Sequence, residues 1–433
     1  MSGILDVKTP TPARTARTLL IEGRTRLEGS YRVQGNKNSA LPLLAASLLA
    51  QSGVKFQNMP RIWDVENMVA LLRTQGTVAE WQGEDLWIDP RNVHYTALPE
   101  DLVQKLRGAI LLVGPMAARL DSMESAFPGG CPIGARTFQA HWDVLEAYGY
   151  GVTEDATSFH VRRLRSAGKP EVYMGESSVT ATENALILFS ALRGGTLHNA
   201  ATEPHVLQLA DFLRVLGAEI ETGANTFRVL SPVKPPPHDI AFEVQPDFVD
   251  AGTMAVAAGA TGGRIVLEKV CHEDLLGIEH VLKQYGVGWD WKQEDVVEVH
   301  ATHLRNPPRV IVGLWPGFPT DLASLVIVLS TQGFGNTLVH DWMYEARMFF
   351  VDKLTRMGAR ITLCDPHRVL VQGPTLLRGT TLESPDIRAG MALIVAGLVA
   401  KGHTRVEHAE VVFRGYERIV ERLAALGASI RED

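Results

Sequence analysis

The chain of 433 residues has few cysteines and no strong charge of either sign. Its three cysteines, Cys131, Cys271 and Cys364, are a sparse and odd-numbered set, which excludes a disulfide framework and indicates a reducing compartment. The formal net charge of −7 argues against a general binder of nucleic acid or of anionic membranes. No apolar run reaches the length of a membrane span, because the stretch over 40–50 is too short and contains Pro42.

The first seventeen residues also lack an apolar segment, which argues against a signal peptide. Their proline, threonine and arginine content predicts a disordered tail over residues 1–17. Together with the cysteine count, this predicts a cytoplasmic protein. The remaining composition, 45% hydrophobic and 21% charged, is ordinary for a soluble globular protein. The chain is longer than a single hydrophobic core normally supports, so we expect two or three domains.

One unit repeats six times along the chain, and six glycines mark its copies. A clear copy over Ala40–Trp81 has a helix of small and apolar residues, a strand, an amphipathic helix and a second strand. The copy over Leu102–Val152 is degenerate, with its first helix predicted over Lys105–Arg119. The marker glycines lie 68 to 73 residues apart, each between a helix and a strand: Gly76, Gly149, Gly217, Gly286, Gly358 and Gly427. A unit of this size cannot bury both its faces alone. We therefore expect three units in each of two similar domains, with the crossing near Pro232–Pro237 and Gln245–Asp247.

Polar or charged residues stand at or near the start of the first helix in all six copies. They are Lys37 and Asn38, Arg107, Ser178, Asp247 and Asp250, Asp321, and Arg388. Helix capping explains serine and aspartate at these places. It does not explain Lys37, Arg107 and Arg388, because a cation opposes the dipole at a helix N-terminus. If the six helix ends converge, these cations and Arg136 surround a negatively charged ligand.

The stretch Pro128–Arg136 combines three glycines and two prolines around Cys131, which excludes a helix or a regular strand. Its backbone has little side-chain bulk and can approach a ligand closely. A cation near the thiol, such as Arg136, lowers the pKa of a cysteine and makes it reactive. The alternative is a surface loop with an incidental thiol.

Five motifs together resemble the enolpyruvyl transferases, in particular those that act on UDP-N-acetylglucosamine. They are Gly35-Asn36-Lys37-Asn38-Ser39-Ala40-Leu41-Pro42, the Cys131 loop, Phe318-Pro319-Thr320-Asp321, Asp386-Ile387-Arg388-Ala389 and Arg414-Gly415-Tyr416-Glu417-Arg418. The resemblance runs from about Leu19 to Asp433. It implies a two-domain inside-out α/β barrel with six βαβαββ-type units, three per domain. One domain would comprise 18–37 plus 246–433, and the other, which carries Cys131, would comprise 38–245.

The resemblance also implies an activity. The enolpyruvyl group of phosphoenolpyruvate moves to the sugar 3′-hydroxyl of UDP-N-acetylglucosamine and phosphate is released, which is the first committed step of peptidoglycan precursor synthesis. Addition of the sugar hydroxyl across the enol double bond needs an acid that protonates the methylene carbon and a base that removes the hydroxyl proton. By resemblance Cys131 is the acid and the target of fosfomycin, and Asp321 is the base or holds the sugar hydroxyl. No metal or organic cofactor, nucleic acid or membrane is implied, and the sequence does not imply an oligomer.

The remaining roles follow from the same resemblance. Lys37, Arg136 and Arg414 would hold the phosphate, Arg388 the carboxylate, and Asn38 would also face phosphoenolpyruvate. Lys37 and Arg388 would share in catalysis, and Arg347 matches another position in the cleft. The sugar-nucleotide site would be lined by Asn38, Arg107, Arg136, Thr137, Phe138, Gln139, Ala140, Ser178, Val179, Asp321 and Met343.

Several residues depart from the pattern of these enzymes. After Arg136 the pattern usually reads Pro-Val-Asp-Leu-His, whereas this chain has Thr-Phe-Gln-Ala-His over 137–141. The other departures are Glu176 for lysine, Thr180 for glycine, Phe248 for arginine and Phe413 for aspartate. Most lie on the nucleotide side, and Glu176 would repel a diphosphate. Two alternatives therefore stay open: a paralogue acting on another uridine nucleotide in secondary metabolism, and a catalytically degraded nucleotide-binding paralogue.

Two further signals favour plain structural roles. The run Cys271-His272-Glu273-Asp274 resembles a metal cluster, but adjacent ligands on so short a run rarely share one ion. The lone histidines His141 and His205 are predicted at surface or core positions, with lining of the cleft as the alternative.

Overall fold

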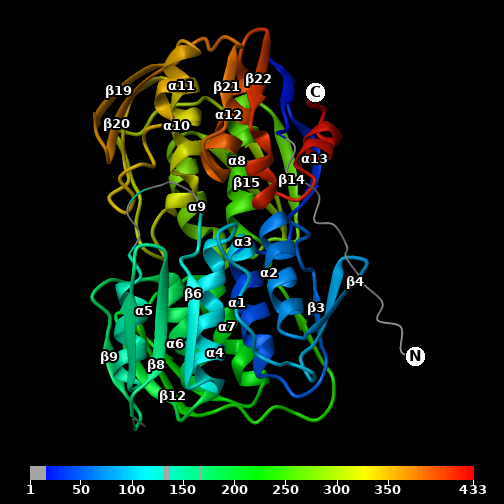
Figure 1. Cartoon of the computed structure of the whole chain (residues 1–433). Helices are drawn as coiled ribbons and strands as arrows, with labels where there is room; N and C mark the ends of the chain where they lie inside the picture. Colours follow the sequence, from blue (N-terminus) through cyan, green and yellow to red (C-terminus); the bar gives the residue numbers. More distant parts are fainter. Residues whose placement is uncertain (1–15, 131–133, 135–136, 166–167) are drawn as a thin grey trace.

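The computed structural model describes residues 16–130, 134, 137–165 and 168–433, and the chain forms two lobes (Figure 1). The first lobe has a hydrophobic core drawn from residues 40–244, and the core of the second lobe is drawn from residues 19–33 and 248–430. These two cores support the predicted domain boundaries, which stay a prediction. Within the predicted tail, residues 1–15 lie outside the described residues, whereas Arg17 pairs with Glu432 at 3.0 Å.

The first lobe contains seven α-helices, two 3₁₀ helices and eleven strands within the described residues. Its helices are α1 (Lys37–Ala46), η1 (Ser47–Leu49), α2 (Trp63–Thr74), α3 (Glu100–Val103), η2 (Arg107–Leu112), α4 (Val113–Arg119), α5 (Gln139–Ala147), α6 (Val179–Ala191) and α7 (Pro204–Val215). Its strands are β3 (Val54–Gln57), β4 (Val78–Gln82), β5 (Asp85–Asp89), β6 (Ser122–Ala126), β7 (Tyr150–Glu154), β8 (Ser158–Arg163), β9 (Glu171–Tyr173), β10 (Gly195–His198), β11 (Glu219–Gly223), β12 (Thr226–Ser231) and β13 (Ile240–Glu243).

The second lobe repeats this arrangement. Its helices are α8 (Phe248–Thr261), α9 (His272–Gln284), η3 (Thr320–Leu322), α10 (Ala323–Gln332), α11 (Val351–Arg356), α12 (Ile387–Val399), η4 (Ala409–Arg414) and α13 (Ile419–Ala425). Its strands are β1 (Leu19–Glu22), β2 (Glu28–Arg32), β14 (Arg264–Glu268), β15 (Val287–Gln293), β16 (Val296–Ala301), β17 (Arg309–Ile311), β18 (Gly335–His340), β19 (Arg360–Asp365), β20 (Arg368–Gly373), β21 (Thr381–Glu383), β22 (His403–Glu407) and β23 (Ile430–Glu432).

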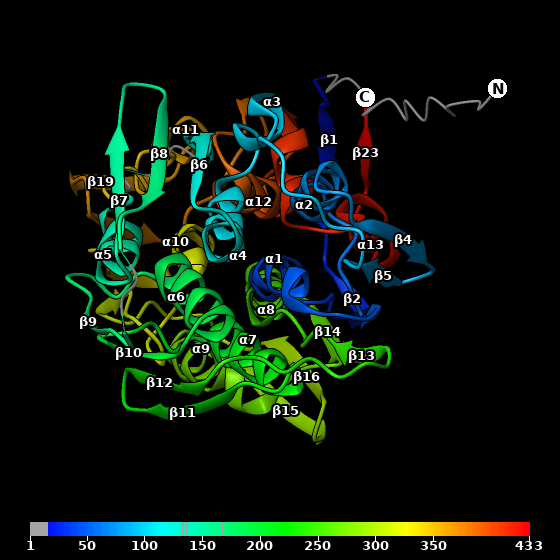
Figure 2. The same ribbon diagram turned by 60° about the horizontal axis from the view of Figure 1, so that its bottom comes forward.

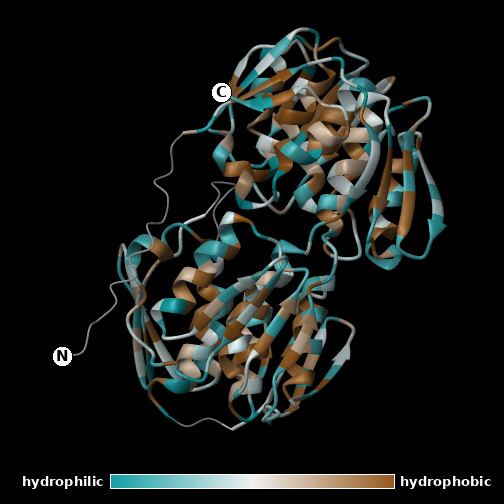
Figure 3. Ribbon diagram, turned by 90° about the vertical axis from the view of Figure 1, so that its right-hand side faces the viewer, coloured by the Kyte–Doolittle hydropathy of each residue, from teal (hydrophilic) through white to brown (hydrophobic). Residues whose placement is uncertain are grey.

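Helices lie inside each lobe and small sheets lie outside, which confirms the predicted inside-out α/β fold. In the second lobe α8, α10 and α12 pack on one another and are buried along most of their length. Such helices are apolar on all sides, as burial on every face requires. In the first lobe α1, α4 and α6 take the same place (Figure 2), and Figure 3 shows apolar residues gathered inside each lobe. No helix in the described part of the chain is long and apolar enough to cross a membrane.

Six small sheets correspond to the six predicted units. Their strand orders are β13-β3-β5-β4, β6-β8-β7 and β11-β12-β10-β9 in the first lobe, and β21-β22-β1-β23, β15-β16-β14-β2 and β17-β18-β20-β19 in the second. All six marker glycines have positive φ angles, between 81° and 98°, directly after a helix, as predicted. The degenerate unit differs from the prediction, because η2 and then α4 replace one helix over Lys105–Arg119. Pro115 has no N–H to donate to a preceding carbonyl, so regular helical bonding cannot run through it.

The chain crosses between the lobes twice, and the two crossing segments are bonded to each other. The backbone N–H of Asn36 donates to the carbonyl of Gln245 at 2.8 Å, and that of Asp247 donates to the carbonyl of Gln34 at 2.9 Å. This pairing places the start of α1 next to the start of α8 at the junction of the lobes.

Candidate active site

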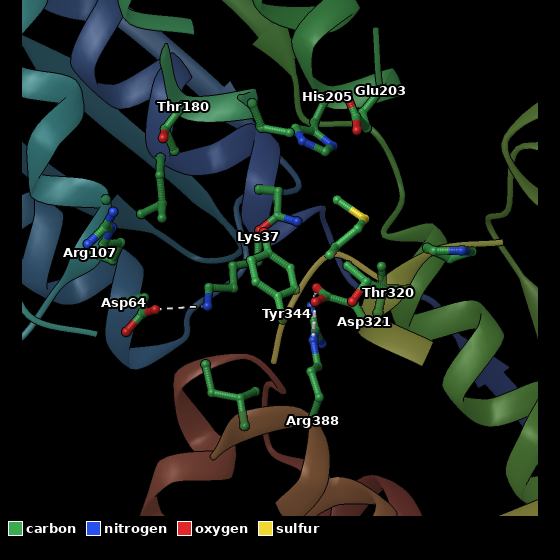
Figure 4. Close-up of a pocket in the computed structure, with 18 of the residues that line it drawn as sticks. Lys37, Asp64, Arg107, Thr180, Glu203, His205, Thr320, Asp321, Tyr344 and Arg388 are labelled. Carbon is green, nitrogen blue, oxygen red and sulfur yellow. Dashed lines mark hydrogen bonds and ion pairs between the residues drawn. The ribbon is translucent and has the colours of Figure 1, made fainter. Parts of the chain in front are cut away.

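A cavity of about 250 Å³ lies where the N-termini of the inner helices of both lobes meet. This confirms the predicted convergence of helix ends, and Figure 4 shows side chains from both lobes around it. The helix ends contribute Lys37 and Asn38 (α1), Arg107 (η2), Val179 and Thr180 (α6), Phe248 and Val249 (α8), Thr320 and Asp321 (η3), and Ile387 and Arg388 (α12). Residues that lie far apart in the sequence therefore form one site.

Helix caps fix the backbone at several of these ends. The side chain of Asn36 accepts hydrogen bonds from the first turn of α1, Asp247 does the same for α8, and Asp386 does so for α12. Ser178 caps α6 by accepting from the N–H of Ala181 at 3.4 Å. The capping explanation therefore holds for Ser178 and Asp247, whereas Asp321 pairs with side chains instead.

Lys37 and Arg414 approach each other from the two lobes through a shared carboxylate. The Nζ of Lys37 lies 2.8 Å from one oxygen of Asp64, and the Nε of Arg414 lies 2.8 Å from the other. The Asp64 side chain is only 3% exposed. Its burial opposes ionisation, but the charges of Lys37 and Arg414 outweigh that effect and lower the pKa of Asp64. Asp64 was not among the predicted site residues, because an acid in the first turn of a helix is an ordinary feature.

Asp321 holds a second charge cluster, in which Arg347 and Arg388 share its carboxylate. Figure 4 shows Arg388 pointing toward Asp321. The Nη2 of Arg388 donates to Oδ2 at 2.9 Å, and the Nη2 of Arg347 donates to Oδ1 at 3.1 Å. Burial alone would raise the pKa of Asp321, but the charges of Arg388, Arg347 and Lys37 hold it well below its ordinary value. Asp321 is therefore a carboxylate, which can accept a hydrogen bond from a substrate hydroxyl.

An acidic wall faces these clusters from α6 and α7. Glu183, Glu203 and His205 line the cavity, and each has a buried polar atom without a hydrogen-bond partner among the described residues. Burial, and then the charge of Glu203, raises the pKa of Glu183 well above its ordinary value. Burial also raises the pKa of Glu203 and lowers that of His205 to about 4. His205 is buried, as a core position would be, and it also lines the cavity, because α7 begins at Pro204 on the edge of the cavity.

The remaining predicted site residues fall into two groups. Val179 and Met343 line the cavity together with Asn38, Arg107 and Arg414. Arg107 also lies 3.9 Å above the ring of Phe138, and its Nη2 donates to the carbonyl of Thr137 at 3.4 Å. Among the described residues, the lining does not include Thr137, Phe138, Gln139, Ala140 or Ser178. Cys131 and Arg136 lie outside the described residues, so their roles stay predictions.

The fold and the cavity define the class of protein. The family model described as EPSP synthase (3-phosphoshikimate 1-carboxyvinyltransferase) matches residues 21–423. The enolpyruvyl transferase NikO from Streptomyces tendae has a similar structure, with a TM-score of 0.86, 24% identity, and coverage of 96% of this chain and 99% of that chain. EPSP synthase from Acinetobacter baumannii has a TM-score of 0.73 at 17% identity, covering 97% of this chain and 100% of its own. The chain has the fold and the family membership of an enolpyruvyl transferase.

Relatives with higher identity narrow this class. A protein of Bradyrhizobium diazoefficiens is 41% identical, covering 95% of this chain and 97% of its own length, and one of Treponema pallidum is 39% identical, covering 95% and 98%. Both are named UDP-N-acetylglucosamine 1-carboxyvinyltransferase. Within the EPSP synthase family, the chain belongs to the UDP-N-acetylglucosamine 1-carboxyvinyltransferases.

Proposed function

We propose that this protein transfers the enolpyruvyl group of phosphoenolpyruvate to the 3′-hydroxyl of UDP-N-acetylglucosamine and releases phosphate. The observation that carries the proposal is the cavity in which cations of both lobes meet Asp321 at converging helix ends. The names of the nearly full-length relatives support the choice of acceptor. The reaction would be the first committed step of peptidoglycan precursor synthesis, carried out in the cytoplasm without a metal or cofactor.

The cations would divide between the two anionic groups of phosphoenolpyruvate. Lys37 and Arg414, with Arg136, would hold the phosphate, and Arg388 would hold the carboxylate. A planar guanidinium suits either anion because it donates two parallel hydrogen bonds. In the structure Asp64 already pairs with Lys37 and Arg414, and Asp321 pairs with Arg388, so the substrate would share or replace carboxylate partners that are in place.

This exchange would activate Asp321. Its pKa is low because Arg388 and Arg347 stabilise the carboxylate, and a carboxylate so stabilised is a weak base. If the substrate carboxylate draws Arg388 away, the pKa of Asp321 rises and its affinity for the hydroxyl proton increases. Asp321 would then take the proton of the sugar hydroxyl only when phosphoenolpyruvate is bound beside it.

The chemical steps follow from the two ends of the enol double bond. The 3′-oxygen forms a bond to C2 of phosphoenolpyruvate while Cys131 gives a proton to C3, which becomes a methyl group. The tetrahedral intermediate then returns a proton from that methyl group to the Cys131 thiolate as the C2–oxygen bond to phosphate breaks. The double bond is restored in the product, and the phosphate leaves toward Lys37 and Arg414. On the acceptor side, Arg107, Asn38, Val179 and Met343 would contact the sugar nucleotide.

The direct test measures phosphate released when the protein is incubated with phosphoenolpyruvate and UDP-N-acetylglucosamine. We expect release to need both substrates, and Cys131→Ala to remove most of the turnover. Release with another uridine nucleotide but not with UDP-N-acetylglucosamine would identify a different acceptor. Tight nucleotide binding without release from any uridine nucleotide would contradict the proposed activity and favour a binding protein.

A second experiment isolates the role of the thiol. Fosfomycin, an epoxide, would alkylate Cys131 and stop phosphate release. We expect Cys131→Asp to keep measurable turnover, because a carboxylic acid can still give a proton, and to be insensitive to fosfomycin. Inactivation of Cys131→Asp by fosfomycin would show that another group is the target.

A further inference from the structure

Thr180 lies on the wall of the cavity formed by the first lobe, in the first turn of α6 (Figure 4). Its Oγ1 is 3.1 Å from Nε2 of His141, and Nδ1 of His141 is 2.9 Å from Nδ2 of Asn184. We infer that these hydrogen-bonded side chains make the Thr180 oxygen an acceptor from His141 and leave its hydroxyl proton free to be donated only into the cavity. The hydroxyl then selects a hydrogen-bond acceptor oxygen of the nucleotide substrate. The inference rests on the proposed function and adds a specificity residue to it.

Two backbone groups set the orientation of the Asn184 side-chain amide. Its Oδ1 accepts from the N–H of Gly114 at 3.0 Å, and its Nδ2 donates to the carbonyl of Ile110 at 2.8 Å. A backbone N–H can only donate and a carbonyl can only accept, so the amide cannot be turned over. The second proton of Nδ2 therefore points at Nδ1 of His141, and Nδ1 must accept.

The second step concerns His141. Burial, together with the charge of Arg107, lowers the pKa of the imidazole to about 3, so the ring is neutral in the working range of pH. A neutral ring whose Nδ1 accepts carries its single proton on Nε2. That proton is donated to Oγ1 of Thr180. His141 is a positioning residue, because it acts through Thr180 and does not line the described part of the cavity.

The third step follows at Thr180. Its oxygen accepts from His141, so the hydroxyl proton must point in another direction. Among the residues that the structure describes, no group accepts this proton, and the side chain faces the cavity. The partner is then an oxygen of the bound substrate, and a carbonyl or phosphoryl oxygen suits it best, because such an oxygen accepts and never donates. The resemblance places a glycine here, which has no hydroxyl to offer.

The test compares the wild type with Thr180→Val, which keeps the shape and removes the donor, and with Thr180→Ser, which keeps the donor. Calorimetry measures binding of UDP-N-acetylglucosamine, UDP and uridine. We expect Thr180→Val to weaken UDP-N-acetylglucosamine binding about three- to tenfold, the worth of one hydrogen bond, and Thr180→Ser to bind within about twofold of the wild type. The KM for phosphoenolpyruvate should not change.

The three ligands locate the oxygen. A loss confined to UDP-N-acetylglucosamine places it on the sugar, a loss shared with UDP places it on the diphosphate, and a loss that persists with uridine places it on the nucleoside. Equal affinity of the wild type and Thr180→Val for all three ligands overturns the inference. If the wild type binds nucleotide but releases no phosphate, the proposed function fails while the comparison of variants still decides the role of Thr180.

A second measurement uses the wild type alone and does not depend on how a variant folds. Nitrogen NMR of the histidine-labelled protein, with the signal of His141 assigned by its loss in His141→Gln, reports which ring nitrogen carries the proton. We expect the Nε2–H form. The Nδ1–H form would overturn the inference, because Nε2 would then accept from Thr180 and use up its hydroxyl proton.

Discussion

At the scale of single residues, two carboxylates at or near the cavity behave in opposite ways. Asp321, which is partly buried, contacts two guanidinium groups, and these hold its pKa well below the ordinary value. Asp247 accepts hydrogen bonds from the backbone of α8, and burial raises its pKa to about 6 although Arg388 opposes the shift. Direct contact with cations, rather than depth, therefore decides which acid is ionised.

The first prediction concerns Asp321→Asn, which removes the carboxylate that Arg388 and Arg347 share and leaves Arg347 only the more distant Asp341, at 3.9 Å. We expect phosphate release to fall by about 10²–10⁴, the worth of a general base, and the free energy of unfolding to fall by about 3 kcal/mol. Steady-state phosphate release and urea unfolding measure the two effects. Asp352→Asn, an exposed acid on α11, is the control and should change neither. Wild-type turnover in Asp321→Asn would contradict the role of Asp321 as the base.

The second prediction concerns Asp247→Asn and the pH dependence of stability. The folded-state pKa of Asp247 is about 6 and its ordinary value is 3.8, so the folded protein binds the extra proton between these values. The stability that this proton provides is present below pH 3.8 and is lost as the pH rises through 6. We expect the difference in unfolding free energy between wild type and variant to drop by about 2 kcal/mol from pH 4 to pH 7. If urea unfolding gives the same pH dependence of the unfolding free energy for the wild type and Asp247→Asn, then Asp247 does not titrate in this way.

At the scale of elements, each repeat depends on a helix that stops at its glycine. The six marker glycines adopt positive φ, which a residue with a Cβ adopts only at a cost. Their surroundings differ. A Cβ at Gly217 would lie 2.7 Å from the carbonyl oxygen of Lys234, whereas one at Gly427 would be 3.8 Å from that of Arg26.

The third prediction compares Gly217→Ala with Gly427→Ala, which serve as each other's control. Both variants have the left-handed backbone at the end of a helix, so we expect each to lose about 1–2 kcal/mol of unfolding free energy. Gly217→Ala should lose more, because its methyl group meets a backbone oxygen that cannot move aside. Urea unfolding of the two variants measures the order, and the reverse order would show that the strand after the helix adjusts freely.

At the scale of the whole molecule, the lobes meet around the first turn of α2. Asp64 bonds to Arg414 of the second lobe, and the ring of Trp63 lies 6.0 Å from that of Phe413. The guanidinium of Arg17 lies over both rings, at 5.9 Å and 5.4 Å. Charge and aromatic contacts therefore hold the two walls of the cavity together, and we expect nucleotide binding to close them further.

The fourth prediction concerns Phe413→Ala, which removes the aromatic contact and leaves every cation in place. We expect a larger radius of gyration by small-angle X-ray scattering, and KM values for both substrates that rise several-fold. Phe334→Ala, an exposed phenylalanine of the second lobe, is the control and should change neither quantity. An unchanged radius of gyration in Phe413→Ala would assign the contact to local packing alone.

Much of this organisation could be predicted from the sequence. The spacing of the glycines predicts six units. Lys37 and Arg388, which are cations at helix N-termini, predict a shared anion site. Both signals depend only on residues near each other in the sequence. Asp64 and Glu203 could not be found in this way. An acid near a helix start has the same pattern whether it is a cap, a surface charge or a pocket residue.

The sequence by itself therefore determined the repeat, the buried helices and the set of polar residues at their N-termini, since these depend on neighbours within a few turns. Only the tertiary structure decided which charges meet. Arg414 reaches Asp64 across 350 positions and Arg388 reaches Asp321 across 67. Whether a buried carboxylate is ionised depends on those distant cations, and their approach is set by how the two lobes pack.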